Sequence, residues 1–188
     1  MQNKIVSHWF DKDFVNLDPL LQKLHVFGGE LLGDVDIIYG TGLSGFIGKR
    51  LAKKMELPEQ GVHKLRVAIS HSKKGLHWNR RFNDNNLVAS LFTPVNNITN
   101  GYWLEKTGPI TMKLTVDIIN GGWYWRCLHI SLFGIPIPLW LIPKSKAFKT
   151  IENGKYKFHV AFTYPLLGNL VSYSGILDAQ YNEHRHSI

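Results

Sequence analysis

The sequence predicts an α+β fold that is mainly β: a long antiparallel meander of about ten strands, curled into a barrel-like or strongly bent sheet, with two short N-terminal helices. Three observations carry this prediction. Beyond residue 60 apolar residues alternate with polar ones, turn residues separate the alternating runs, and helical periodicity is confined to the first third of the chain. Tight turns force neighbouring strands to be antiparallel, and a long meander tends to curl because closure removes exposed edges.

The 188 residues are expected to form a single domain, 1–188. An opening region of helix, strand and helix is expected over 1–60, the meander over 61–180, and a frayed tail over 181–188. No stretch has the pattern of a signal peptide or of a membrane-spanning helix. We therefore expect a soluble, cytoplasmic protein, with peripheral membrane contact as an alternative.

The first predicted helix begins at Asp18 and Pro19, a typical N-cap followed by proline at the first helical position. It ends before Gly28, and His25 is expected in its last turn as a cation that complements the helix dipole. A strand is predicted over 29–40. A second, amphipathic helix follows, whose apolar side is expected to carry Phe46, Ile47, Leu51 and Met55.

Between this strand and this helix, Gly40, Gly42 and Gly45 fit the GxGxxG pattern of dinucleotide-binding proteins. That motif functions inside a βαβ unit, in which a parallel strand follows the helix. Here Pro58 and an antiparallel meander follow instead. We interpret the glycines as turn and helix-entry residues, and expect no cofactor at this corner.

The strands of the meander are predicted where residues alternate with a period of two. The clearest alternation is in ITMKLTVDI, and the strongest hairpin signals are the turns at Gly121-Gly122 and Asn153-Gly154. The predicted strands cover residues 63–70, 76–82, 86–95, 101–106, 110–118, 123–133, 146–152, 155–164 and 168–177.

The candidate binding residues come from arginines that alternate in phase with aromatic residues. Arg80 shares a predicted face with Trp78 and Phe82, and Arg126 lies between Tyr124 and Leu128. A guanidinium on an interior face needs a partner, and Glu105, on the face of Trp103, is the best candidate. Either the arginines pair with carboxylates and fix strand register, or they line an apolar pocket and hold the acidic head of a ligand.

These residues predict a non-enzymatic module that binds a lipid-like or other apolar small molecule with a polar or acidic head. The predicted ligand-binding residues are Trp78, Arg80, Phe82, Trp103, Glu105, Tyr124 and Arg126. The alternative is a small enzyme with an acid–base cluster of Arg80, Glu105, His71 and His77. The period-two phase places His77 opposite Arg80, and we assign no catalytic residue. The spacing of the histidines predicts no metal site, and the single cysteine, Cys127, excludes an intrachain disulfide.

The proline-rich segment GIPIPLWLIPKSK, residues 134–146, is too apolar for an ordinary loop. It either folds back to plug one end of the barrel or is exposed as a gating loop that contacts lipid. In the second case the contact residues are Ile135, Ile137, Leu139, Trp140, Lys144 and Lys146.

The formal charge of +8 favours an anionic partner, such as an anionic membrane surface. The basic residues are spread along the chain rather than gathered on one element. Nucleic acid is therefore not an expected partner.

Four motifs resemble the bacterial DUF4166 family, a domain of unknown function: HWNRRF, LEKTGPI, GIPIPLWLIPK and YPLLGNLVSYSGIL. The resemblance covers nearly the whole chain and gives no catalytic residues. It implies a stand-alone bacterial copy of a domain that is elsewhere fused behind dehydrogenase-like Rossmann domains. It also implies, as an alternative function, a substrate-handling accessory domain for a separate oxidoreductase. The residues that it emphasises are Trp78, Arg80, Phe82, Glu105, Pro136, Pro138, Pro143 and Gly168.

Overall fold

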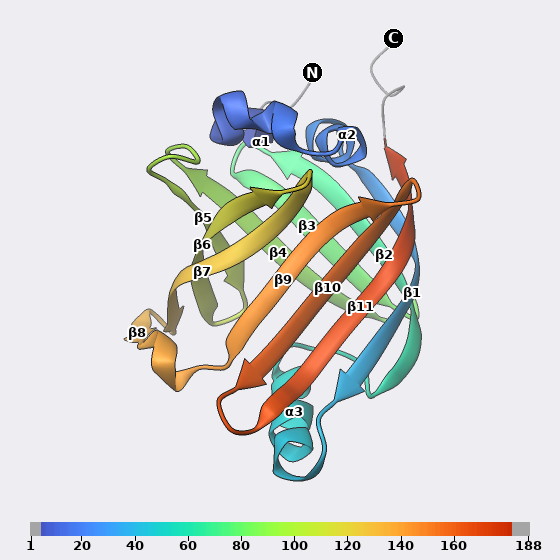
Figure 1. The fold of residues 1–188 in the computed structure, drawn as a ribbon, viewed down its shortest axis with the longest axis vertical. Helices are drawn as coiled ribbons and strands as arrows, with labels where there is room; N and C mark the ends of the chain where they lie inside the picture. Colours follow the sequence, from blue (N-terminus) through green and yellow to red (C-terminus); the bar gives the residue numbers. More distant parts are fainter. Residues whose placement is uncertain (1–4, 182–188) are drawn as a thin grey trace.

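The computed structural model describes residues 5–181, so the predicted tail beyond residue 181 lies outside the described residues. The fold is a closed, ten-stranded antiparallel barrel with one short extra strand (Figure 1), which confirms the predicted class. The strands of the ring are β1 (Gly29–Tyr39), β2 (Gly61–Ser72), β3 (Gly75–Phe82), β4 (Asn86–Val95), β5 (Tyr102–Thr107), β6 (Ile110–Ile119), β7 (Gly122–Leu132), β9 (Lys144–Glu152), β10 (Lys155–Tyr164) and β11 (Gly168–Tyr181). The extra strand is β8 (Ile135–Ile137).

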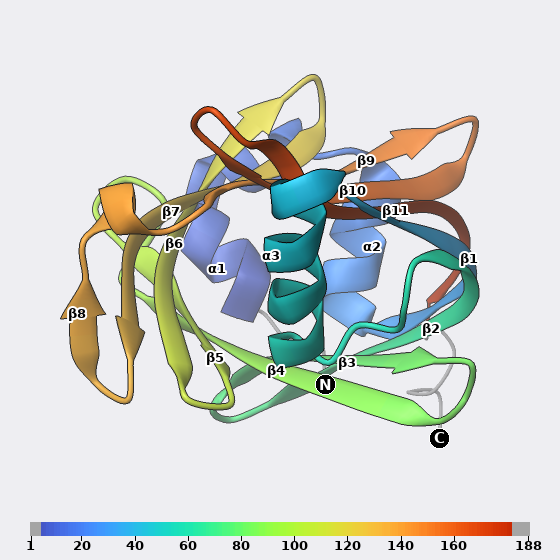
Figure 2. The ribbon, with the colours of Figure 1, turned by 90° about the horizontal axis from the view of Figure 1, so that it is seen from below.

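Helices lie at both ends of the barrel (Figures 1 and 2). At one end, here called the α1–α2 end, lie α1 (Ile5–Phe10), the 3-10 helix η1 (Asp11–Asn16) and α2 (Pro19–Phe27). At the other, here called the α3 end, lies α3 (Gly42–Lys54). The two predicted helices are α2 and α3. The predicted N-cap is confirmed, because the Asp18 carboxylate accepts a hydrogen bond from the Leu20 backbone N–H at 2.8 Å.

The ring closes because strands from the two ends of the chain pair with each other. The first strand, β1, pairs with β11 on one side and β2 on the other, both antiparallel. The most limited pairing in the ring is between β7 and β9, where Trp123–Trp125 face Ala147–Lys149. Towards the α3 end β7 pairs with β8 instead, while β9 continues along β10 as far as Lys144.

Aromatic side chains fill the α1–α2 end of the barrel. Trp9 of α1 lies 5.4 Å from the Trp103 ring, and Phe10 lies 4.7 Å from the Trp123 ring, measured between ring centroids. All four side chains are fully buried. The sequence analysis did not predict α1, although this helix supplies much of the apolar contact that closes this end.

The buried residues of α3 are small, while Leu51 and Met55 of the predicted apolar side are partly buried against the core. Ser44, Gly48 and Ala52 are buried, whereas Phe46 is 56% exposed. A Cβ atom on Gly48 would lie only 1.8 Å from the Leu170 carbonyl oxygen of β11. The spacing of four residues between these small side chains lets the helix backbone approach the strand closely.

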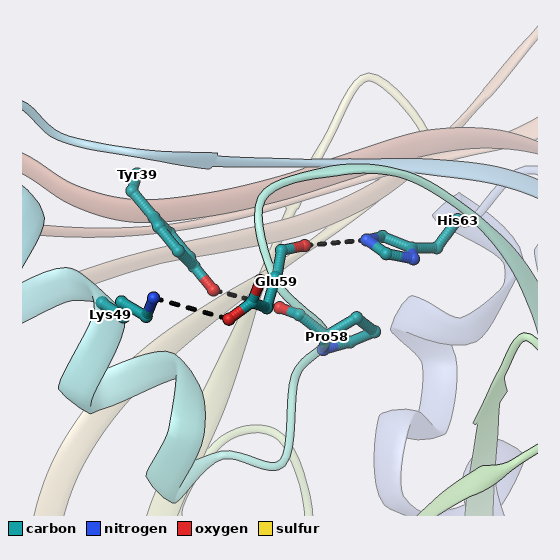
Figure 3. Close-up of polar contacts among 5 residues, drawn as sticks. All are labelled: Tyr39, Lys49, Pro58, Glu59 and His63. Carbon is teal, nitrogen blue, oxygen red and sulfur yellow. Dashed lines mark hydrogen bonds and ion pairs between the residues drawn. The ribbon is translucent and has the colours of Figure 1, made fainter.

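The glycine-rich corner is a tight turn into α3 rather than part of a βαβ unit. The strands on either side of this helix, β1 and β2, are antiparallel neighbours. Beyond the helix, Glu59 forms an ion pair with Lys49 at 3.4 Å, and the Tyr39 hydroxyl donates to the Pro58 carbonyl at 3.1 Å (Figure 3). The Glu59 carbonyl oxygen lies 2.7 Å from Nε2 of His63. The one acidic side chain in Figure 3 is therefore engaged with a cation of the helix on the protein surface.

None of the helices in the described part of the chain is long and apolar enough to cross a membrane.

Candidate ligand-binding interior

Five of the seven predicted binding residues lie on the inner wall of the barrel. Two strands on either side of β4 supply them: β3 carries Trp78, Arg80 and Phe82, and β5 carries Trp103 and Glu105. Phe82 and Trp103 belong to the hydrophobic core, and Trp78 packs against it. The strand alternation that places these residues on one face is therefore the alternation that the sequence predicted.

A chain of hydrogen bonds connects Arg80 to Glu105 inside the barrel. A guanidinium N–H of Arg80 donates to Ser90 Oγ of β4 at 2.6 Å. The hydroxyls of Ser90 and Thr107 are 2.9 Å apart, and the Thr107 hydroxyl donates to Glu105 Oε1 at 3.3 Å. The predicted partner of Arg80 is thus reached through two hydroxyls on adjacent strands.

Burial shifts the pKa values of the titratable groups along this series of hydrogen bonds. Burial raises the pKa of Glu105, and the attraction of Arg80 and the hydrogen bonds from Ser90 and Thr107 only partly oppose this rise. Burial also raises the pKa of Tyr173, which lies near Arg80 on the interior side of β11. The interior therefore combines the Arg80 guanidinium with a carboxyl group and a phenol whose pKa values are both raised.

Arg80 retains hydrogen-bonding capacity that its neighbours do not use. Its Nε atom is buried and has no hydrogen-bond partner among the described residues. The side chains of Arg80, Glu105 and Trp78 are only half-buried, although the barrel wall surrounds them. A polar oxygen atom of a ligand in this part of the interior would find an unused N–H donor.

Tyr124 and Arg126 do not face the interior, and their predicted placement there is wrong. The residues of β7 that face inward are Trp123, Trp125 and Cys127. Arg126 is exposed and forms two hydrogen bonds of 3.0 Å with the Asp117 carboxylate across the β6–β7 pair. This bidentate pair follows the alternative in which an arginine fixes strand register. Tyr124 stacks on Phe148 instead, with 5.1 Å between ring centroids.

The residues of the predicted acid–base cluster are only partly together. Arg80 and Glu105 are linked, but Nε2 of His77 lies 2.8 Å from the Ser72 hydroxyl, on the opposite side of β3. His71 lies near the α1–α2 end, where its Nε2 is 2.8 Å from the His25 carbonyl oxygen. Among the described residues no group of three His, Cys, Asp or Glu side chains could hold a metal ion.

A second polar feature of the interior, which sequence analysis missed, is a buried lysine. Lys149 of β9 lies with its Nζ atom 2.6 Å from Nε2 of His25 and 3.7 Å from the centroid of the Trp123 ring. The expectation that His25 is a cation at the helix terminus is wrong, because burial lowers the pKa of this imidazole well below its usual value, with nearby Lys149 lowering it further. The missed signal was the phase of the strand, in which Lys149 alternates with Ala147 and Ile151 on one face.

Comparison with known protein families identifies the chain. A model of the family described as "Domain of unknown function (DUF4166)" matches residues 17–177. The chain belongs to the DUF4166 family. No curated protein is similar enough to count as a match.

The proline-rich segment of this DUF4166 chain is exposed, so the alternative in which it plugs the barrel is wrong. The segment forms β8 and a short 3-10 helix, η2 (Leu139–Leu141), at the α3 end of the barrel (Figure 1). Trp140 is 76% and Ile135 is 69% exposed. Leu139, Lys144 and Lys146 are exposed as well, and Ile137 is half-buried. Helices α1 and α2 instead close the barrel at the α1–α2 end.

A shallow surface depression of about 430 Å³ lies between α2 and the strand ends of the DUF4166 barrel. It includes none of the polar interior residues, and we do not place the candidate site there. Its lining consists of Asp18, Pro19, Leu20, Lys23, Ile151, Gly154 and Tyr181.

Proposed function

We propose that the barrel binds a lipid-like or other apolar small molecule and holds its polar, acidic head at Arg80. The observation that carries this proposal is the buried, unpartnered Nε of Arg80 within an aromatic-lined barrel. An acidic head brings acceptor oxygens to this donor, and the raised pKa of Glu105 lessens the repulsion between its carboxyl group and the head. The proposed function is binding, and no catalytic role is assigned to Arg80 or Glu105.

Oleate and oleyl alcohol test this proposal, because they share one chain and differ in the head. We expect isothermal titration calorimetry to show tighter binding of oleate. Replacing Arg80 by Met should weaken oleate binding about tenfold or more, since a charge-assisted hydrogen bond contributes about 1.5–3 kcal/mol. Binding of oleyl alcohol should change much less.

The matched control is Arg81→Met, which removes an exposed arginine from the other face of the same strand. It should leave oleate binding unchanged. Near-ultraviolet circular dichroism checks that both variants are folded. Equal loss in both variants, or no binding of either ligand by the folded wild-type protein, would refute the proposal.

We further propose that the α3 end of the barrel contacts an anionic membrane surface, from which such a ligand would enter. Exposed apolar side chains on three separate segments support this: Phe46 of α3, Ile135 and Trp140 of the proline-rich segment, and Leu166 of the β10–β11 turn. Lys144 and Lys146 follow Trp140 within the same segment and are exposed. Apolar side chains that insert and cations that meet phosphates are the usual combination at a lipid interface.

Vesicle co-sedimentation tests the membrane contact. We expect binding to vesicles of phosphatidylcholine with phosphatidylserine, and weaker binding without phosphatidylserine or at high salt. Trp140→Ser should reduce binding severalfold. Val15→Ser, which removes an exposed apolar residue of η1 at the opposite end, should not. Unchanged binding of the Trp140 variant would contradict the proposal.

A separate oxidoreductase partner stays a prediction from the family resemblance, and its test is a pull-down with a specific dehydrogenase-like protein. Cytoplasmic localisation is likewise a prediction.

A further inference from the structure

Lys149 is an unusual residue because its charged end is enclosed by the barrel without an acidic partner. The side chain is 5% exposed, and none of the ion pairs among the described residues includes it. Lysine is almost never fully buried unless it is paired. A lysine placed here only to support α2 would incur a desolvation cost that an apolar residue avoids.

The surroundings of the amine are aromatic. Nζ lies 3.7 Å, 4.6 Å and 5.8 Å from the ring centroids of Trp123, Trp78 and Trp125 respectively. The His25 imidazole stacks on Trp123 and Trp78, with centroids 4.7 Å and 5.8 Å away. Three indoles and one imidazole therefore enclose a single amine.

The hydrogen bonds of His25 determine its tautomer. Nδ1 lies 2.7 Å from the Leu21 carbonyl oxygen, which can only accept, so Nδ1 carries the proton. Nε2 then presents its lone pair to Lys149, at 2.6 Å. The imidazole is thus placed to accept a proton from Nζ.

Burial lowers the pKa of Lys149 well below its usual value. A neutral amine is a nucleophile, whereas an exposed lysine with a pKa near 10.4 has roughly one neutral amine in 2,500 at pH 7. Desolvated lysines of this kind form Schiff bases with carbonyl compounds.

The amine faces the same interior as the proposed ligand site. Trp78, whose ring Nζ approaches, is two residues from Arg80 on one face of β3. Neighbouring side chains on one face of a strand are about 7 Å apart, which is short compared with an extended apolar ligand. A ligand in the barrel can therefore reach both groups.

We propose that Lys149 is a covalent attachment site for apolar carbonyl compounds, in which a long-chain aldehyde or ketone held inside the barrel forms an imine with Nζ. The proposal rests on the proposed binding function and names a ligand class for it. Nζ attacks the carbonyl carbon, and the carbonyl π electrons move to oxygen. Two protons pass in turn from the attacking nitrogen through His25 Nε2 to the former carbonyl oxygen: the first turns the alkoxide into the carbinolamine hydroxyl, and the second protonates that hydroxyl. The hydroxyl leaves as water when the C=N bond forms, so the amine and the carbonyl compound give an imine and one water without an oxidant or reductant.

Reductive trapping with decanal tests this proposal on the full chain. The protein is incubated at pH 7 with one equivalent of decanal and sodium cyanoborohydride, which reduces an imine to a stable secondary amine. Intact mass should show one decyl adduct per chain, and peptide mapping should place it on Lys149. We expect labelling of Lys149 to be about tenfold faster than labelling of Lys157, a half-exposed lysine on β10 that pairs with Glu152.

Three variants test the assignment of the adduct. Lys149→Met, which keeps the volume and loses the amine, should abolish the fast adduct, whereas Lys157→Met should not change it. Circular dichroism checks folding, and the mapping of wild-type protein stands even if Lys149→Met fails to fold. His25→Gln should slow labelling while Lys149 remains the labelled residue.

Calorimetric binding of 1-decanol separates the two proposals, because this alcohol cannot form an imine. If decanol binds but decanal labels only exposed lysines, the imine proposal is overturned and the binding function stands. If decanol does not bind and Lys149 is not labelled, both proposals fail. An adduct that persists in Lys149→Met also overturns the attachment site.

Discussion

Among single residues, the contrast between two arginines shows how position decides the role of a charge. Arg126 lies on the outer surface and makes a bidentate pair with Asp117, which holds the pKa of that carboxyl below its usual range. Exposed pairs of this kind contribute about 0–1 kcal/mol to stability. Arg80 interacts with the hydroxyls of Ser90 and Tyr173 and keeps a buried Nε–H that has no partner among the described residues. The surroundings of Arg80 therefore contribute little to stability, and they leave a donor that a ligand could use.

His25 predicts how stability depends on pH. In the unfolded chain its pKa is about 6.5, and burial lowers the pKa in the fold. Below pH 6.5 the unfolded state therefore binds a proton that the folded state does not, and stability falls as pH falls, by up to about 1.4 kcal/mol per pH unit. In His25→Gln this additional slope below pH 6.5 should disappear, as measured by urea unfolding from pH 7.5 to 5.

Other groups contribute to the same curve, so the difference between the two proteins is the readout. The lowered pKa values of Lys149, His71 and His159 give a slope of the same sign, and the raised pKa of Glu105 gives the opposite sign. All four are present in both proteins. Parallel curves for wild type and His25→Gln would show that His25 is not buried in its neutral form.

Among the secondary-structure elements, α3 packs closely against β11 because the residues at the contact have small side chains or none. Its large apolar residues Leu43 and Phe46 are exposed, while Gly48 lies directly against the backbone of β11. Of the residues predicted on its apolar side, Leu51 and Met55 do pack against the core, but Phe46 does not. The signal for the buried face was the series Ser44, Gly48 and Ala52, which recurs every four residues.

Gly48→Ala should destabilise the protein even though alanine favours helix by about 1 kcal/mol over glycine. The added Cβ would meet the Leu170 carbonyl, and the helix must shift to avoid it. We expect a net loss of about 1–3 kcal/mol in urea unfolding. Lys53→Ala, on the exposed side of the same helix, should change stability by less than about 0.5 kcal/mol. A neutral Gly48 variant would show that α3 does not dock closely.

At the scale of the whole molecule, the alternating pattern predicted the barrel because each strand repeats the same two-sided environment. Ile110 to Ile118, for example, alternate between the interior and the outer surface without help from distant residues. Closure itself depended on pairing between β1 and β11, whose partners are far apart in the chain. Such pairing leaves no local signature, so sequence analysis left a closed barrel and a bent sheet as equal outcomes.

The inner face of β7 could not be predicted for a related reason. Trp123 and Trp125 lie inside, but Tyr124 on the outer face is also aromatic, so alternation alone did not distinguish the two faces. The register between β6 and β7 distinguishes the two faces, because it brings Arg126 close to Asp117 on the outer surface. Likewise α1 is too short for a periodic signal, and only its contacts with Trp103 and Trp123 show its importance.

Hydrogen exchange should show that backbone amides are protected to different degrees around the barrel. Backbone amides of β1 and β11, paired along the whole of β1, are expected to exchange most slowly. Amides of Trp123–Trp125 and Ala147–Lys149 should exchange faster, because so few residue pairs join these strands. Mass spectrometry of peptides from both regions measures this difference. Equal protection would show that the β7–β9 junction opens only when the whole barrel unfolds.

The distribution of tryptophan also provides built-in optical reporters. Of the six tryptophans, Trp9, Trp103 and Trp123 are fully buried and Trp140 alone is largely exposed. Acrylamide should therefore quench a red-shifted fraction of the fluorescence that belongs to Trp140, while the buried indoles keep a blue-shifted emission. A ligand inside the barrel and a lipid surface at the proline-rich segment would then alter separate parts of one spectrum, without any attached dye.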